Sequence, residues 1–249
     1  MNAATRGAVL EVENVTVRFG GNIALHDVAM TARPGAVTGL IGPNGAGKTT
    51  LFNVICGLQR PDAGSVRIGD QDVTRMLPYK RARAGLARTF QRLELFTLLS
   101  VRSNVRIAAD VDRRNRRDRT VDPDRVADEV LERVGLRAVA DARVDQLPTG
   151  QARLVEVGRA LAARPRVLLL DEPAAGQDDT ETSAFAALLR DLAAEGLTIV
   201  LVEHDVQLVL RVCDDVNVLD FGELLATGTP AEIQRNPAVI AAYLGEGVS

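Results

Sequence analysis

The order of apolar and polar residues along the chain predicts two kinds of strand. Residues 9–19 alternate between apolar and polar side chains, which is typical of an antiparallel strand with one face in water. A Gly-Gly turn follows, and residues 23–32 continue as a second strand. The apolar runs at 37–41, 167–170 and 197–202 instead predict strands that are buried on both faces, as in parallel sheets.

Helical patterns separate and follow these strands. Residues 151–163 and 182–195 place apolar side chains at helical spacing, and Pro165 and Gly196 supply stop signals. The shorter predicted elements are helices at 50–56, 101–109, 125–134, 230–234 and 237–244, a strand at 65–68, and a hairpin of strands 216–219 and 224–227 around Gly222. Buried strands that alternate with helices predict an α/β fold with a mainly parallel sheet.

Residues 92–154 differ from the rest because they are rich in Arg and Asp and mostly helical in pattern. We expect them to form a helical lobe inserted into a core of residues 1–91 and 155–229, with terminal helices in 230–249. A chain of 249 residues suits one such domain, and 46% apolar residues suffice for its core.

Composition limits the classes of function. A net charge of −3 argues against a nucleic-acid binder. No run reaches the roughly 18 apolar residues of a membrane span, and residues 1–8 lack the apolar segment of a signal peptide. Cys56 and Cys213 lack the spacing of a metal or redox pair, which fits a reducing compartment. We expect a cytoplasmic protein that reaches a membrane only through partners.

The sequence Gly-Pro-Asn-Gly-Ala-Gly-Lys-Thr at 42–49 matches the phosphate-binding pattern G-x-x-x-x-G-K-[ST]. It lies between a buried strand and a helix, so phosphates would meet free N–H groups at the helix N-terminus. Lys48 is one of only two lysines among 30 basic residues, which argues against chance. A Gly-rich turn without a ligand is the alternative. The predicted nucleotide contacts are Gly42, Pro43, Asn44, Gly45, Ala46, Gly47, Lys48, Thr49 and Thr50.

Two carboxylates end the strand at 167–170. Asp171 is placed to hold Mg2+ through water, together with the hydroxyl of Thr49. Glu172 is placed to act as general base toward an attacking water. Two acids that merely lead the strand into a loop are the alternative interpretation.

Between these motifs stands Leu-Pro-Thr-Gly-Gln at 147–151, which opens a helix. With a short Gly-Gln segment between the phosphate loop and the two carboxylates, the chain resembles the ATP-binding subunits of ABC transporters. The resemblance extends over nearly the whole chain. The resemblance implies a P-loop ATPase core with an N-terminal antiparallel β subdomain and an inserted helical lobe. It also implies ATP and Mg2+ as ligands.

The resemblance assigns further residues to the site. Gln91 corresponds to the glutamine that reaches the Mg2+ and water and senses the membrane subunits, and His204 to the histidine that contacts the γ-phosphate. Phe19 corresponds to the aromatic residue that stacks on adenine, although a core Phe at a strand end competes with this interpretation. The remaining predicted nucleotide contacts, which would act across a dimer, are Gly150, Gln151 and Asp178.

Three residues depart from the family pattern. Pro148 stands in place of a Ser and Thr149 in place of a Gly, so the hydroxyl contact of that Ser is in doubt while the helix N-terminus remains. Gln177 replaces a Leu in the loop after the two carboxylates, which bears on packing across the dimer.

Residues 87–96, 170–176 with Glu181, and 236–246 resemble the branched-chain amino-acid importer subunits in particular. The implied partners are a second ATPase subunit (a second copy or a sister chain), two transmembrane permeases and, indirectly, a substrate-binding protein. The implied location is the inner face of the cell membrane. The alternatives are a lipid or lipopolysaccharide exporter subunit and a non-transport ABC ATPase. A GTPase is excluded, since neither lysine stands in an Asn-Lys-x-Asp motif.

The arginine-rich run at 113–119 could contact nucleic acid or lipid headgroups. Because the run lies within a helical lobe that is interrupted by Asp residues, we interpret it as a solvated, salt-bridged surface.

Overall fold

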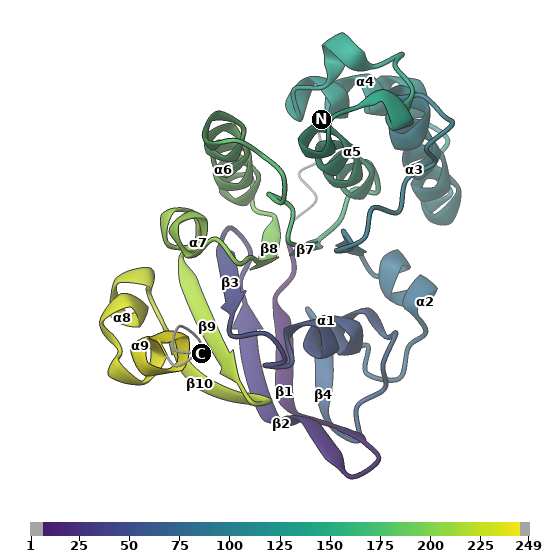
Figure 1. The fold of residues 1–249 in the computed structure, drawn as a ribbon. Coiled ribbons are helices and arrows are strands. Elements are labelled where there is room, and N and C mark those ends of the chain that lie inside the picture. Colours follow the sequence, from purple (N-terminus) through teal and green to yellow (C-terminus); the bar gives the residue numbers. More distant parts are fainter. Residues whose placement is uncertain (1–6, 245–249) are drawn as a thin grey trace.

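The computed structural model describes residues 7–244 and has two sheets and a separate helical lobe, seen in Figure 1. Among these residues, no helix combines the length and the apolar character that a membrane crossing needs. The family-like stretch 236–246 ends two residues beyond the described range.

The larger sheet places the ends of its parallel strands along one edge. Its strand order is β10-β9-β3-β8-β7-β6, in which β9 and β10 form an antiparallel hairpin and the other pairs are parallel. The strands are β3 (Val37–Ile41), β6 (Leu86–Arg88), β7 (Val167–Asp171), β8 (Thr198–Val202), β9 (Asp215–Asp220) and β10 (Glu223–Gly228). Every residue of β3, β7 and β8 is buried, as their apolar runs predict. The segments that follow these strands therefore meet at one edge.

The smaller sheet is antiparallel and has the order β2-β1-β4-β5. Its strands are β1 (Leu10–Phe19), β2 (Asn22–Ala32), β4 (Ala63–Ile68) and β5 (Gln71–Asp72). Helix α1 (Lys48–Cys56) packs against both sheets through Leu51, Phe52 and Ile55, which are fully buried in one apolar cluster with β1, β2 and β7. The wet face of β1 is confirmed by its alternating burial.

The helical lobe consists of α3 (Val101–Arg116), α4 (Pro123–Arg133) and α5 (Thr149–Ala162), with short 3-10 turns at Arg137–Val139 and Val144–Gln146. These helices share an apolar cluster that includes Val105, Leu131 and Val155. Helix α5 also reaches the core, since Val157 packs with β7 and β8. The helix runs without a break through residue 154, so the lobe boundary drawn there stays a prediction.

The helices beside the core complete the fold. They are α2 (Pro78–Arg83), α6 (Asp179–Ala194), α7 (Val206–Val212), α8 (Pro230–Arg235) and α9 (Pro237–Leu244). The sequence pattern did not predict α2, α7 or the three-residue strand β6, because elements this short carry too few apolar positions to show a period. Helix α3 passes its predicted end at 109, since Asp110 and Asp112 pair with arginines one turn further on.

Candidate nucleotide and hydrolysis site

The loop after β3 can adopt its shape only with glycine at two positions. Gly42 has φ +154°, and a Cβ there would lie 2.0 Å from the carbonyl oxygen of Leu219. Gly47 has φ +105°, and its Cβ would lie 2.7 Å from the Leu25 side chain. At Gly45 a Cβ would meet no atom within 4 Å, so the loop is open to a ligand there.

The loop ends at the N-terminus of α1, where a charge complement to phosphate is already present. Gly47 is the N-cap residue and provides no side chain to cap the helix. Lys48 is buried, and its Nζ donates to the carbonyl oxygens of Gly42 at 2.5 Å and Pro43 at 2.9 Å. The N–H groups of a first helical turn and a lysine ammonium together make a site for an anion such as phosphate.

A cavity of about 370 Å³ joins the phosphate loop to the edge of the sheet. It brings together the predicted site residues Asn44, Gly45, Ala46, Gly47, Lys48, Thr49, Thr50, Gln91, Glu172 and His204. Its other walls are Asn22, Ile23, Ala24, Phe221 and Gly222. The predicted residues that do not line it are Phe19, Gly42, Pro43, Gly150, Gln151, Asp171 and Asp178.

Two of the predicted catalytic side chains contact the third, which is the carboxylate of Glu172. Nε2 of His204 lies 2.7 Å from Oε1 of Glu172, and Nε2 of Gln91 donates to both Glu172 oxygens at 3.3 Å. Glu172 has φ +50°, and its N–H donates to the carbonyl of Val202 on β8. This left-handed turn directs the carboxylate out of the strand line, and the carboxylate thus lies between a histidine and an amide in one cavity.

Asp171 lies deeper than the cavity wall. It is 3% exposed, and its Oδ2 accepts a hydrogen bond from Nη2 of Arg88 at 2.8 Å. Its N–H donates to the hydroxyl of Thr89. No cluster of three or more His, Cys, Asp or Glu within residues 7–244 has the arrangement to hold a metal. The predicted metal-site residues, Thr49, Gln91 and Asp171, supply a single carboxylate and two neutral oxygens. This set fits Mg2+, which is typically bound through one or two carboxylates and completes its shell with substrate phosphates and water.

An aromatic residue that the sequence interpretation did not single out lines the cavity. Phe221, in the β9–β10 turn, is 89% exposed, and Phe19 at the end of β1 is 52% exposed. The adenine-stacking role of Phe19 stays a prediction, since its ring is available but does not form the cavity wall. The only sequence signal for Phe221 was a ring next to the turn residue Gly222.

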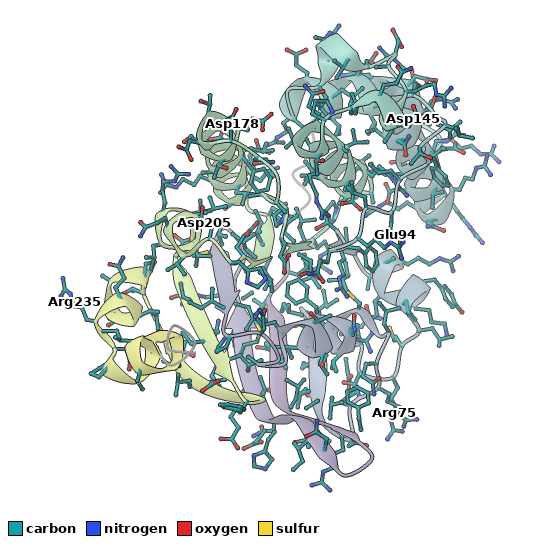
Figure 2. All side chains as sticks on the ribbon, in the orientation of Figure 1. Arg75, Glu94, Asp145, Asp178, Asp205 and Arg235 are labelled. Carbon is teal, nitrogen blue, oxygen red and sulfur yellow. The ribbon has the colours of Figure 1, made fainter. Side chains whose placement is uncertain are left out.

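The segment 147–151 lies away from the phosphate loop, at the start of α5 in the lobe (Figure 1). It packs against the loop after Glu172: a Cβ at Gly150 would lie 3.3 Å from Gln177, and one at Gly176 would lie 3.2 Å from Thr149. Thr149 and Gln177, which both depart from the family pattern, thus lie on opposite sides of this packed region. Asp178, labelled in Figure 2, caps α6 and forms a capping box with Glu181.

Two further residues hold the catalytic segments in place. Arg153 of α5 donates to the carbonyl oxygens of Phe90 at 2.8 Å and Gln91 at 2.5 Å. These bonds tie the lobe to residues 90–98, the Gln91 segment. The buried carboxylate of Glu203 accepts from the N–H groups of Ala174 and His204. Burial raises the pKa of Glu203. Sequence reasoning assigned no role to either residue, because the partners of Arg153 and one partner of Glu203, Ala174, lie in other segments.

Glu203→Gln should flatten the dependence of stability on pH. Because the pKa of Glu203 is raised in the folded protein, its contribution is fully present below the unfolded value of about 4.3 and is lost as pH rises through the folded value. The amide cannot ionise, so less stability should be lost from pH 4.5 toward neutrality. Urea unfolding across this window measures the slope of the free energy of unfolding against pH. Part of that slope should persist because burial also raises the pKa of Glu156. An unchanged slope would contradict the account.

The arginine-rich run lies at the end of α3 and is paired as expected for a solvated surface. Arg113 and Arg114 contact Asp110, and Arg116 and Arg164 contact Asp112. These pairs neutralise much of the positive charge that a polyanion would need.

Two models of known protein families match most of the sequence. The model of the ABC transporter family matches residues 25–175, and that of the branched-chain amino acid ATP-binding cassette transporter family matches residues 223–249.

Individual relatives match over nearly the whole chain. The high-affinity branched-chain amino acid transport ATP-binding protein BraF of Pseudomonas aeruginosa is 38% identical over 96% of this chain and 98% of its own. The lipopolysaccharide export system ATP-binding protein LptB of Escherichia coli is 35% identical over the same shares. The crystal structure of the ADP conformation of MJ1267, an ATP-binding cassette of an ABC transporter, superposes with a TM-score of 0.84 at 30% identity, over 96% of this chain and 99% of that one.

Proposed function

This chain belongs to the ABC transporter family and is one of its ATPases, and from this premise we propose that it energises the import of branched-chain amino acids or related small solutes. The contact of Glu172 with His204 and Gln91, in the same cavity as Lys48, is the observation that supports hydrolysis at this place. The family match of residues 223–249 and the likeness to BraF support the class of solute.

The proposed hydrolysis assigns one task to each group. Glu172 accepts the proton of the attacking water as general base. His204 holds that water and the γ-phosphate, and the α1 N-terminus with Lys48 offsets the phosphate charge. Thr49, Gln91 and Asp171 would hold Mg2+, which, when bound, neutralises charge on the β- and γ-phosphates.

A second ATPase subunit completes the site in this proposal. The phosphate loop and the segment 147–151 occur once each, and Gly150 and Gln151 do not line the cavity that contains Lys48. The α5 N-terminus is therefore available to a nucleotide held by another subunit, with Asp178 at the same seam. That subunit is a second copy or a sister chain.

The permeases would dock on the Gln91 segment. Phe96 and Leu98 are large apolar side chains that are 47% and 73% exposed, and neighbouring exposed apolar residues are typical of an interaction surface. Glu94, labelled in Figure 2, lies in the same segment between the core and the lobe. A cavity of about 330 Å³ beside it has mostly apolar walls. One permease bound here, and a second one bound to the other ATPase subunit, would hold the pair at the inner face of the membrane. A binding protein would act on the permeases from the other side.

Export of a lipid or lipopolysaccharide is the second candidate, supported by the 35% identity to LptB. The ATPase chemistry is common to both systems, and the solute is selected by other subunits. A non-transport ABC ATPase remains a third candidate, which permease binding would exclude.

Reconstitution separates these candidates. The chain is purified with candidate permease subunits and inserted into liposomes that contain ATP and Mg2+. Labelled leucine is supplied outside together with the cognate binding protein. We expect uptake that requires ATP and is lost with Glu172→Gln. If leucine and related solutes are not taken up while lipid or lipopolysaccharide is extracted, the exporter assignment replaces ours.

A further inference from the structure

Arg88 joins three elements of the site through one buried guanidinium. It ends β6, and its side chain is 6% exposed. Nη2 donates to Oδ2 of Asp171 at 2.8 Å, and Nη1 donates to Oδ1 of Asn53 on α1 at 2.7 Å. One cation therefore contacts both the end of β7 and the helix that carries Lys48 and Thr49.

Two rings hold the guanidinium plane. Its central carbon lies 5.4 Å from the ring centre of Phe52 and 4.8 Å from that of Phe90. Arginine is suited to this place because its planar, weakly hydrated cation stacks on rings while its edge donates to an acceptor. A lysine ammonium supplies the charge but neither the plane nor the fork of donors.

Asp171 is consequently fixed at two points by adjacent residues. Its side chain is held by Arg88 and its backbone N–H by the hydroxyl of Thr89. The Asp171 side chain is 4% exposed, so its rotation is restricted by these contacts and by packing. With Oδ2 engaged by Arg88, Oδ1 is the oxygen left for a metal or for the water that the metal carries.

We propose that Arg88 is a positioning residue for Mg2+, which acts by orienting the Asp171 carboxylate. The proposal rests on the assignment of Asp171 as a metal-site residue in the proposed function. Partners that orient a metal-binding side chain typically contribute 10–100-fold to metal affinity. Loss of the guanidinium should therefore weaken metal binding while nucleotide contacts through the phosphate loop persist.

The test measures metal dependence of nucleotide binding rather than turnover. Binding of a fluorescent ATP analogue to the isolated chain is titrated with Mg2+, and bound Mn2+ is counted by electron paramagnetic resonance. Arg88→Met should raise the half-saturating Mg2+ concentration by about 10–100-fold, with little change in binding in EDTA. Arg88→Lys should recover part of the loss. Arg83→Met is the matched control, because Arg83 also lies over a ring, that of Tyr79, but on the surface.

Asp171→Asn distinguishes a failure of the positioning role of Arg88 from a failure of the metal assignment of Asp171. If it shifts the Mg2+ dependence while folded Arg88→Lys and Arg88→Met proteins retain the wild-type value, Arg88 has no positioning role. If Asp171→Asn leaves the Mg2+ dependence unchanged, the metal assignment itself is wrong and the role of Arg88 falls with it. If Arg88→Met does not fold, the Arg88→Lys titration decides, because that variant keeps the buried charge pair. A raised half-saturating Mg2+ concentration in Arg88→Lys supports the proposal, and a wild-type concentration overturns it.

Discussion

Glu172→Gln should lower steady-state ATP hydrolysis by about 10²–10⁴-fold and leave ATP bound. The amide matches the carboxylate in shape and keeps an oxygen for the contact that His204 makes at 2.7 Å. It cannot take the proton of the attacking water. Since ATP then stays intact, a closed dimer should accumulate with ATP and Mg2+. A steady-state hydrolysis assay measures turnover, a nucleotide titration measures ATP affinity, and light scattering after size exclusion measures dimer formation.

Glu223→Gln is the matched control for this experiment. Glu223 is also paired with a histidine, His26, at 2.9 Å, but both side chains are more than half exposed on the β2 and β10 strands. That variant should hydrolyse ATP at the wild-type rate. Loss of both ATP binding and turnover in Glu172→Gln would mean that Glu172 is structural. A Glu172→Gln protein that stays monomeric with ATP, also after addition of its sister ATPase, would refute the shared site.

Lys48→Ala should weaken ATP binding by about 10–100-fold and leave adenosine binding nearly unchanged. A hydrogen bond to a charged group contributes about 1.5–3 kcal/mol, which corresponds to this range of affinity. Lys48 is 8% exposed and borders the cavity, so solvent screens its charge only weakly. Isothermal titration with ATP–Mg2+ and with adenosine measures the two affinities.

Lys80→Ala controls for the loss of one positive charge, because Lys80 is the other lysine of the chain and lies exposed on α2. It should bind ATP as the wild type does. Equal ATP affinity for Lys48→Ala and wild type at physiological Mg2+ would remove the phosphate-loop assignment.

The fold and the centre of the site were predictable where the signal is local. The phosphate loop at 42–49 is a contiguous pattern, and apolar runs locate β3, β7 and β8 without further information. His204 and Gln91 needed the family resemblance, since a single His or Gln in a loop carries no signal of its own. The structure then brings both side chains to Glu172.

The contacts of Arg88 and Arg153, which sequence reasoning missed, are long-range. Arg88 meets Asp171 across 83 positions, and Arg153 meets Phe90 across 63. Nothing in the neighbouring residues of either arginine indicates such a partner, because the pairing is decided by strand order and by the placement of the lobe. The buried pairing of Asp171 was unforeseen for the same reason, since the apolar run predicts where the strand ends but not what its last carboxylate contacts.

At Glu172, the backbone conformation lowers the stability of the fold, while the side chain serves ATP hydrolysis in the proposed mechanism. Its φ of +50° lies in the left-handed region, where a residue with a side chain is destabilised by roughly 1–3 kcal/mol and glycine is not. Under the proposed mechanism, replacing Glu172 with glycine would relieve this backbone strain, remove the carboxylate contacts with Gln91 and His204, and abolish hydrolysis in one step.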